Sequence, residues 1–440
     1  MIYSTNMEFI ADLHIHSKYA RATSPKMNLA ELDRFAQDKG ITLMGTGDFT
    51  HPDYFAEIEE QLEPAEPGLY KLKKDFQLPM ISGELPTKTR FILSSEISSI
   101  YTREGRGRRI HTLFYLPSLA AAAKFNQLLE KNGANLRSDG RPIVGLDVRK
   151  IVDLALTADS RALIIPAHIW TPWFSMFGSK SGFNSIQECF GEYTKQIFAV
   201  ETGLSSDPLM NWRVSQLDSV ALISNSDSHS LERIGREANI FNTELSYDGV
   251  VAALKNNTPE KFVATLEYFP EEGRYHFDGH RQCRVCWSPE KTRKNRGICS
   301  VCGKPVTIGV LNRLDKLADR GLAEIPLREV QIGVVSGKTT GNRIPFVNLI
   351  TLDTLLAQAR GVVGVKTQTV KKIYEHLIRE VGSELYILLK APLAEIGAAS
   401  DDRVLKSIKR MREQKFWIEP GYDGEYGKVQ IFSAKEQKAL

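Results

Sequence analysis

Short apolar runs alternate with longer stretches of helical periodicity over residues 8–270. The apolar runs predict seven strands, at residues 9–11, 41–44, 91–93, 110–116, 162–165, 197–200 and 220–223. Apolar residues at helical spacing predict helices that include residues 29–39, 119–131, 148–158 and 247–256. Strands that alternate with helices in this way are typical of parallel β/α units.

Polar residues follow six of the seven predicted strands directly. The first strand is followed by Asp12-Leu13-His14-Ile15-His16, and side-chain alternation along a strand places Asp12, His14 and His16 on one face. His111 differs from the other candidates, because it lies near the start of the fourth strand. Further candidates follow the later strands. They are the pair Asp48 and His51, then Glu96, His168 and Glu201, and finally the pair Asp227 and His229.

Side chains at the carboxyl ends of the strands form the active site of a closed β/α barrel. Because the pattern gives seven strands and not eight, we predict an α/β fold that begins with a distorted seven-stranded barrel over residues 1–272. An open doubly wound sheet with solvated strand ends is the alternative. That alternative gives no reason for histidines and acids to gather at those ends.

The nitrogen and carboxylate donors at the strand ends predict a metal site. There are nine of them: His14, His16, Asp48, His51, Glu96, His111, His168, Asp227 and His229. This exceeds what one tetrahedral ion needs, so we expect about two or three divalent ions, either zinc or, during turnover, manganese or magnesium. The alternative for the H-x-H motif by itself is a strand edge with two solvated histidines.

Bridged metal ions of this kind suit phosphoester hydrolysis. No nucleophilic Ser or Cys motif and no Walker-type loop competes with that interpretation. We assign catalysis to Asp227, His229 and Glu201. Glu201 is either a base or a partner that orients a metal-bound histidine.

The long connection after His168 carries four early aromatic residues, Trp170, Trp173, Phe174 and Phe177. Long loops over a barrel mouth are often functional, and aromatic rings there could stack an extruded base. The alternative is a hydrophobic cluster that packs the loop down. The two interpretations are compatible.

Four arginines lie within residues 103–109, which we expect to form the tip of a hairpin. Arg106 and Arg108 are candidates for contacts with backbone phosphates, and a solvated turn is the alternative. Arg236 is a further candidate phosphate contact.

Two C-x-x-C pairs, Cys283/Cys286 and Cys299/Cys302, predict a structural zinc ribbon over residues 273–310. Residues 281–320 hold ten Lys/Arg against three acids, and Arg293, Lys294 and Arg296 lie between the two pairs. We expect this local excess to grip duplex DNA, or, as the alternative, to be solvated around a zinc staple between domains. Helical spacing after Val310 predicts an α-helical C-terminal domain over residues 311–440, which we also expect to hold DNA.

Composition changes this picture little. The net charge of +4 over 440 residues does not by itself indicate nucleic-acid binding. No run of apolar residues is long enough to span a membrane, and no secretory signal is evident, so we expect no membrane partner. Paired cysteines suit metal binding in a reducing compartment, which predicts a cytoplasmic protein.

The motif series resembles that of the PHP (polymerase and histidinol phosphatase) superfamily, whose members are distorted seven-stranded barrels with polynuclear metal sites. The resemblance rests on residues 12–17, Gly47-Asp48, Glu96, His111, His168 and 226–229. There are two departures. The superfamily often has T-D-H where this chain has Gly47-Asp48-Phe49, with the histidine displaced to His51, and residues 19–22 lack a further usual ligand.

Residues 45–52, 166–191, 201–208 and 224–239 are similar to the endonuclease Q branch of that superfamily. The resemblance implies a metal-dependent endonuclease that cuts damaged double-stranded DNA 5′ to a deaminated base (uracil, hypoxanthine or xanthine) or an abasic site. The alternatives are a PHP-type phosphatase for a small phosphomonoester and a non-catalytic DNA-binding repair accessory protein. The sequence indicates no protein partner.

Overall fold

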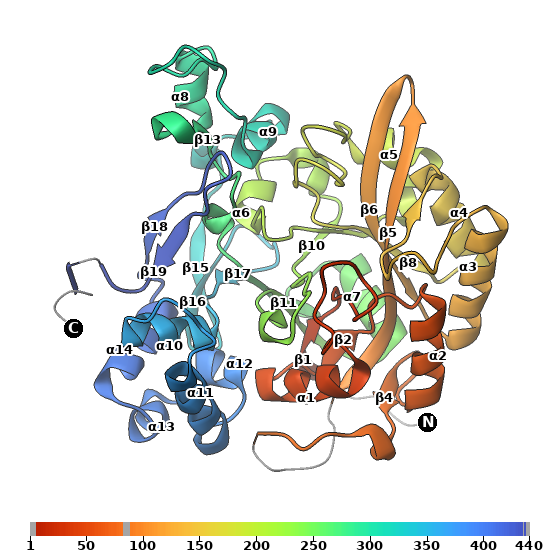
Figure 1. The fold of residues 1–440 in the computed structure, drawn as a ribbon, viewed down its shortest axis with the longest axis horizontal. Coiled ribbons are helices and arrows are strands. Elements are labelled where there is room, and N and C mark those ends of the chain that lie inside the picture. Colours follow the sequence, from red (N-terminus) through yellow and green to blue (C-terminus); the bar gives the residue numbers. More distant parts are fainter. Residues whose placement is uncertain (1–5, 82–88, 434, 437–440) are drawn as a thin grey trace.

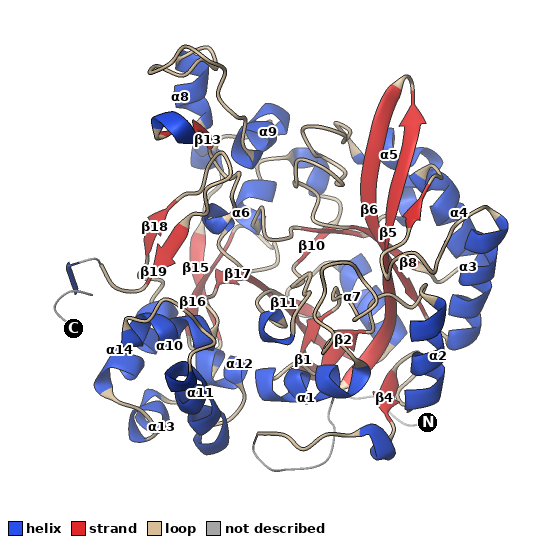
Figure 2. Cartoon of the chain, in the orientation of Figure 1, coloured by secondary structure: helices blue, strands red, loops and turns tan. Residues whose placement is uncertain are grey.

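The computed structural model describes residues 6–81, 89–433 and 435–436, which form a mixed α/β fold (Figures 1 and 2). Every predicted strand region contains a strand. In chain order these are β1 (Met7–Asp12), β2 (Leu43–Gly45), β5 (Arg90–Arg103), β6 (Arg106–Leu116), β8 (Leu163–Pro166), β9 (Ala199–Glu201) and β10 (Ala221–Ile223).

The pairing of these seven strands follows a closed path. β1, β2 and β5 are parallel neighbours, β6 pairs with both β5 and β8, and β9 pairs with β10. Two isolated parallel bridges complete the path, Ile164↔Ile197 between β8 and the start of β9 and Ile15↔Ser228 between the ends of β10 and β1. The polar residues that follow β1 and β10 therefore lie side by side.

β6 departs from the expected parallel order, because it is antiparallel to both of its neighbours. The physical reason is its connection to β5. Glu104 and Gly105 both have positive φ, 52° and 71°, as the central residues of a two-residue hairpin do, so no helix intervenes. The hairpin tip predicted at residues 103–109 is confirmed, and this hairpin projects from the molecule (Figure 2).

The four predicted helices are present with the predicted bounds: α1 (Leu29–Lys39), α3 (Leu119–Lys131), α4 (Val148–Ala158) and α7 (Tyr247–Asn256). Each begins after a polar residue whose side chain accepts a hydrogen bond from a backbone N–H of the first turn, namely Asn28, Ser118, Asp147 and Ser246. The remaining elements of this part are α2 (Pro52–Gln61), β3 (Leu62–Pro64), β4 (Tyr70–Leu72), β7 (Ile143–Val144), α5 (Ile186–Phe190), α6 (Pro208–Asn211), β11 (Ala238–Thr243) and β12 (Phe262–Glu267).

Alternate residues of all seven strands of the closed path enter a single hydrophobic cluster. Phe9 and Ala11 of β1, Ile92 of β5 and Ile223 of β10 are among its members, and all are at most 2% exposed. The residues between them pack against the surrounding helices in a second cluster. Side-chain alternation therefore divides the core between the inside and the outside of the path.

A small segment follows the barrel strands. It contains β13 (Asp278–His280), β14 (Val285–Trp287) and α8 (Pro289–Lys294). Val285, Trp287, Cys299 and Val306 form its own hydrophobic cluster. In Figure 1 it lies at one corner of the molecule, close to α9 (Val310–Leu317).

The part expected to be helical after residue 311 also contains strands. β15 (Arg328–Ile332), β16 (Val335–Thr339) and β17 (Phe346–Asn348) extend the main sheet, because β17 runs parallel to β12. The helices lie beyond them: α10 (Leu352–Arg360), α11 (Gln368–Glu380), α12 (Glu384–Leu389), α13 (Leu393–Ala398) and α14 (Asp402–Arg412), followed by β18 (Trp417–Glu419) and β19 (Lys428–Gln430). The predicted α-helical C-terminal domain is confirmed for residues 352–412 but is wrong for residues 328–348, which form strands. There the more buried residues alternate at the two-residue period of strands, Val330 and Ile332 on β15 and Val335 and Thr339 on β16.

Among the described helices, none combines the length and the hydropathy needed to cross a bilayer.

A buried ion pair joins the first helix to the C-terminal helices. Lys39 of α1 donates to Glu384 of α12 over 2.6 Å, and both side chains are only 3% exposed. Glu384 also accepts from the Tyr374 hydroxyl at 2.8 Å and from the backbone N–H of Leu352 at 3.1 Å. One carboxylate therefore ties α1, α10, α11 and α12 together.

We expect Glu384→Gln to lower the free energy of unfolding by about 3–5 kcal/mol, because it leaves the Lys39 ammonium buried without a counter-charge. Urea unfolding followed by circular dichroism measures this. The matched control is Glu8→Gln, which breaks a half-exposed pair with Lys390 between the same two parts of the chain and should cost about 0–1 kcal/mol. Equal losses in the two variants would contradict the assignment.

Candidate metal centre

Seven of the nine predicted donors meet at the end of the closed strand path. They form three overlapping groups, His14/His16/Glu96, His16/Asp227/His229 and Glu96/His111/His168. Within each group the donor atoms all lie within 4.8 Å of one another. Since His16 and Glu96 each belong to two groups, the three groups form one continuous cluster.

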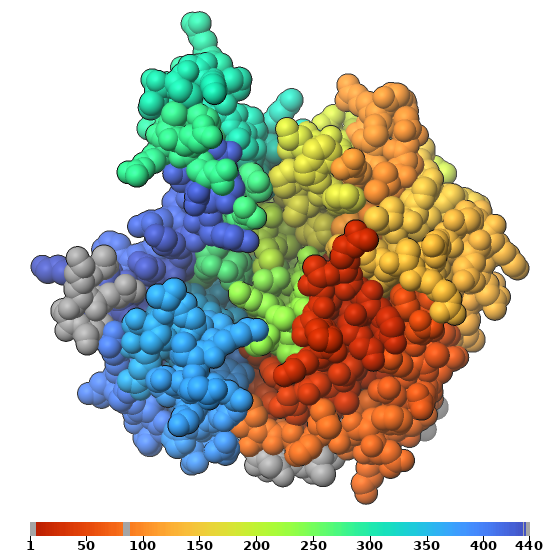
Figure 3. All heavy atoms as spheres, in the orientation of Figure 1, coloured from red at the N-terminus to blue at the C-terminus, as the bar shows by residue number. Residues whose placement is uncertain are grey.

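Five segments supply these donors, and the strand path brings them together. His14 and His16 follow β1, Glu96 lies in β5, and His111 lies in β6. His168 follows β8, and the pair Asp227 and His229 follows β10. Figure 3 shows a hollow between the C-terminal part, in blue, and the N-terminal part, in red and orange, with green residues lining it.

Glu96 lies at the centre of the cluster and is fully buried. Its Oε1 is 2.8 Å from His111 Nδ1 and 3.0 Å from His168 Nε2. Its Oε2 is 3.3 Å from His16 Nε2 and 3.8 Å from His14 Nε2. A carboxylate with imidazoles on both oxygens has the placement of a ligand that bridges two metal ions.

Two further carboxylates orient the imidazoles of the H-x-H motif. His14 Nδ1 donates to Glu201 at 3.0 Å, and His16 Nδ1 donates to Asp48 at 3.0 Å. These bonds fix the tautomer that leaves each Nε2 as an acceptor facing the cluster. In the described part of the chain, neither Nε2 has a hydrogen-bond partner, and neither does Asp227 Oδ1.

Buried polar atoms without a partner cost free energy, unless a missing ligand satisfies them. Three such atoms that converge from a carboxylate and two imidazoles fit a divalent cation. The donor set is therefore suited to a site for two or three metal ions.

The electrostatics of the cluster point the same way. Burial disfavours the imidazolium, yet Glu201 and Asp227 hold the pKa of His14 well above its ordinary value. Burial also opposes ionisation of Asp227, but His14 and His16 keep its pKa well below the ordinary range. In the metal-free state protons thus supply the positive charge that the ionised carboxylates require, and metal binding would displace them.

Asp48, His51 and Asp12 lie outside the three groups of donors. Asp48 accepts from His16, from the backbone N–H of Ser17 at 2.6 Å and from the Ser17 hydroxyl at 2.7 Å, so it orients a ligand. The His51 ring stacks on Tyr19 at a centroid distance of 4.4 Å.

The expectation that Asp12 faces the metal with His14 and His16 is wrong. Its carboxylate accepts from the backbone N–H groups of Ser226 at 3.1 Å and Gly235 at 2.9 Å, at the two ends of the loop that carries Asp227. The reason is that β1 ends at Asp12, so strand alternation does not continue through the motif.

The backbone is strained at three residues of the site. Asp48, His168 and Asp227 have φ values of 46°, 30° and 46°, in a region that L-residues with side chains rarely adopt. Strain of this kind persists where the surrounding structure enforces it, and it is typical of functional sites. Gly203 shows how crowded the site is, because a Cβ there would lie 2.5 Å from the Cβ of His168.

The four aromatic residues of the loop after His168, which we call the aromatic loop (residues 169–185), divide into two pairs. Trp170 and Phe177 are fully buried with ring centroids 5.0 Å apart, and Trp170 Nε1 donates to Asn211 at 2.7 Å. They pack the loop down, as the alternative interpretation expects. Trp173 is 46% exposed and Phe174 is half-buried, with the Phe174 ring centroid 4.9 Å from that of His111.

The arginines of the hairpin divide in the same way. Arg108 is buried over the Phe183 ring and donates to the Gly182 carbonyl, so its expected role as a phosphate contact is wrong. Arg106 is exposed. The guanidinium of Arg109, also exposed, lies 4.8 Å from the centroid of the Trp173 ring.

Arg236 holds the backbone of the loop that carries Asp227. It donates to the Ser226 carbonyl at 2.9 Å and 2.7 Å, which positions the loop and occupies the guanidinium. On α8, Lys294 pairs with Glu290 at 2.8 Å, and Arg293 pairs with Asp315 of α9. Lys294, Arg293 and Arg296 are exposed, so they can still face a polyanion.

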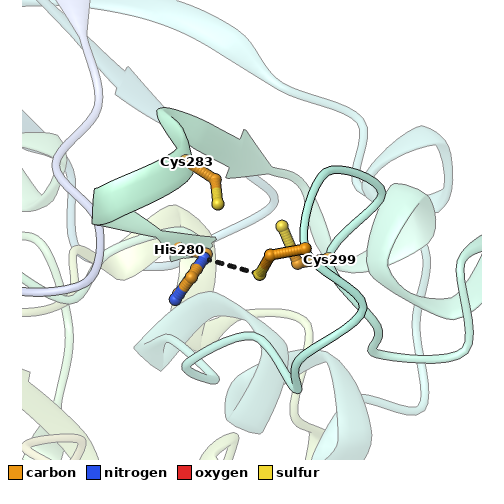
Figure 4. A group of neighbouring side chains, drawn as sticks. His280, Cys283 and Cys299 are labelled. Carbon is orange, nitrogen blue, oxygen red and sulfur yellow. Dashed lines mark hydrogen bonds between the residues drawn. The ribbon is translucent and has the colours of Figure 1, made fainter.

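The cysteine cluster differs from the predicted four-thiolate set. Cys283, Cys299 and Cys302 come together with His280, with their donor atoms within 4.8 Å of one another (Figure 4). Cys286 lies apart, with its Sγ 4.0 Å from the Pro420 carbonyl. The register explains this, because Cys286 is opposite Gly279 and therefore faces away from His280 on the β13–β14 hairpin.

This group suggests a structural zinc site. Desolvation raises the pKa of the Cys299 thiol, but hydrogen bonds from the backbone of Cys302 and Val301 and from the Cys302 and His280 side chains together lower it to about 6, as a thiolate ligand requires. Sequence analysis missed His280, although the spacing H-x-x-C-x-x-C was available as a signal. It also missed Arg141, whose guanidinium donates to Glu96 at 3.0 Å from a loop without a recognisable motif.

Comparisons with known proteins identify relatives over the whole chain. The uncharacterized protein YqxK of Bacillus subtilis is 30% identical over 433 residues, which cover 95% of this chain and 98% of YqxK. The family model described as the MJ0043 C-terminal domain matches residues 351–415.

Two solved structures are similar in fold. The lesion-specific endonuclease PfuEndoQ from Pyrococcus furiosus gives a TM-score of 0.80 at 27% identity over 99% of both chains. Endonuclease Q in complex with a 27-mer duplex substrate, with an abasic lesion at the active site, gives 0.79 at 28% identity over 98% of both chains.

We expect Glu201→Gln to weaken metal binding by roughly 10- to 100-fold, because the neutral side chain no longer fixes the His14 tautomer. Titration of metal-stripped protein, followed by calorimetry, measures the affinity. Glu130→Gln, at an exposed position of α3, is the matched control and should bind metal like the wild type. Unchanged affinity in Glu201→Gln would show that Glu201 does not support a metal ligand.

Proposed function

The chain belongs to the endonuclease Q family, and on that premise we propose that it is a metal-dependent DNA repair endonuclease. It hydrolyses the phosphodiester bond 5′ to a deaminated base (uracil, hypoxanthine or xanthine) or an abasic site in double-stranded DNA. The observation that carries this proposal is the convergence of seven donors, five of them buried and Glu96 at their centre, in a fold shared with an enzyme solved on an abasic duplex.

The donor set assigns a reaction class. Divalent ions held by these residues would withdraw charge from the phosphoryl oxygens and lower the pKa of a bound water near neutrality. Glu96 and Asp227 supply negative charge between the imidazoles, and Glu201 and Asp48 keep His14 and His16 in the ligating tautomer. We assign Asp227 and His229 to the catalytic face, because their side chains are 24% and 30% exposed while His14 and His16 are buried.

The exposed part of the aromatic loop is our candidate for lesion recognition. Trp173 and Phe174 flank the Arg109 guanidinium beside His111, so a nucleotide turned out of the duplex could stack next to the metal donors. Exposed basic side chains extend the surface on which DNA could bind. They are Arg106 at the hairpin tip and Arg293, Lys294 and Arg296 on the small segment with the cysteine cluster. The cytoplasm remains our predicted location.

We expect Asp227→Asn and His14→Ala to lower nicking of a uracil-containing duplex by on the order of 10³-fold, because each removes a charged or nitrogen ligand from the metal site. Both variants should still bind the duplex in a gel-shift assay, and chelator should abolish nicking by the wild type. Asp248→Asn, a largely exposed position on α7, is the matched control with full activity. Undiminished nicking by either variant would refute the assigned chemistry.

Trp173→Ala should lower kcat/KM on lesion duplexes by roughly 5- to 150-fold, because it removes one stacking face. This factor corresponds to a loss of about 1–3 kcal/mol of transition-state stabilisation. The comparison is Trp417→Ala, which removes a tryptophan that is 59% exposed on β18, outside the aromatic loop, and should leave cleavage unchanged. A larger effect at Trp417 than at Trp173 would place lesion recognition elsewhere.

A further inference from the structure

We propose that Arg141 contacts the scissile phosphate and stabilises its negative charge during hydrolysis, an inference that rests on the proposed function. The guanidinium of Arg141 enters the donor cluster from outside the seven strands. Its Nη1 donates to Glu96 Oε2 at 3.0 Å, and its side chain is 26% exposed while Glu96 is fully buried. Arg141 therefore lies between the central carboxylate and solvent, where a substrate phosphate must approach.

The chain places Arg141 there through backbone pairing. β7 runs parallel to β5 with Ser98 opposite Ile143, and Ser98 N donates to the Pro142 carbonyl at 3.0 Å. This register sets Arg141 beside Glu96. The preceding residue fixes the loop, because a Cβ on Gly140 would lie 2.6 Å from Asp48 Oδ2, and Gly140 N donates to the Tyr19 carbonyl at 2.9 Å.

The guanidinium has capacity left for a substrate. Within residues 6–81, 89–433 and 435–436, the contact with Glu96 is the one hydrogen bond that its five N–H groups make. A bidentate partner on the remaining N–H groups therefore fits without loss of the contact with Glu96. Phosphate oxygens match the planar fork of arginine better than the point charge of lysine.

Charge balance favours the same role. The Arg141–Glu96 pair neutralises a buried carboxylate in the metal-free protein. Divalent ions held by the imidazoles around Glu96 would add positive charge beside the guanidinium. The phosphodiester of DNA supplies an anion that can pair with both.

The test compares Arg141→Ala and Arg141→Lys with the wild type on duplexes that carry uracil, hypoxanthine or an abasic site. Arg137→Ala is the matched control, because Arg137 lies on the same loop, is 68% exposed and pairs with Asp53 at 2.8 Å. We expect Arg141→Ala to lower kcat/KM by roughly 10²- to 10³-fold, by the same factor on every lesion, since a phosphate contact does not read the base. Arg141→Lys should recover part of the loss, and Arg137→Ala should cleave normally.

A second readout does not depend on turnover. We would measure the Kd of metal-loaded protein for an abasic duplex, with either a phosphate or an uncharged methylphosphonate at the scissile position. Replacement of the scissile phosphate by the uncharged methylphosphonate should weaken duplex binding by the wild type more than binding by Arg141→Ala or Arg141→Lys. Metal content, measured by mass spectrometry, should be equal in all three proteins.

Three outcomes would each overturn the inference. They are normal cleavage by Arg141→Ala, an equal effect of the methylphosphonate on binding by the wild type and the variants, and loss of metal in parallel with activity. Arg141→Lys keeps the charge and carries the test alone if Arg141→Ala does not fold, and full activity of that variant would then refute a bidentate contact. If the wild type nicks none of the three duplexes, the proposed function itself is refuted. If the wild type nicks them and Arg141→Ala nicks them at the same rate, only the role of Arg141 is refuted.

Discussion

The structure depends on hydrogen bonds between buried carboxylates and imidazoles that follow different strands. Each bond holds its imidazole in one tautomer. Glu201 at the end of β9 fixes His14 after β1, and Asp48 after β2 fixes His16. The His16–Asp48 bond joins residues that follow the paired strands β1 and β2, whereas the His14–Glu201 bond spans 187 residues and forms only once β9 and β10 lie beside β1. The core packing of the strands and the chemistry of the site are therefore one constraint, and a defect in either would disturb the other.

A second set of contacts links the metal centre to α9, which packs against the small segment that carries the cysteine cluster. Arg313 of α9 donates to the carbonyls of Phe177 and Phe183 in the aromatic loop, at 2.9 Å and 2.8 Å. Arg108 holds the same loop from the hairpin. Trp173 and Phe174 thus lie on a loop that two arginines from different elements hold in place, which suits a rigid stacking face. A structural zinc at the cysteine cluster beside α9 would help to hold Arg313, and through Arg313 the aromatic loop, in place.

Much of the fold and of the donor set could be predicted, because the signals are local. Apolar runs mark the strands, capping residues such as Ser118 mark helix starts, and histidines at strand ends converge in any closed path. What could not be predicted depends on which face of a segment is covered. Arg108 and Arg109 are neighbours in sequence and both contact the aromatic loop, but only Arg108 is buried by it. Trp170 and Trp173 differ in the same way, and the register of a short hairpin decides that His280, and not Cys286, meets the other cysteines.

The decisive measurement is anomalous diffraction from crystals grown with manganese or zinc. We expect about two or three peaks within bonding distance of Glu96, His14, His16, Asp227 and His168, and one peak at the cysteine cluster. A single peak at the cysteines, with none near Glu96 under metal-replete conditions, would contradict this expectation.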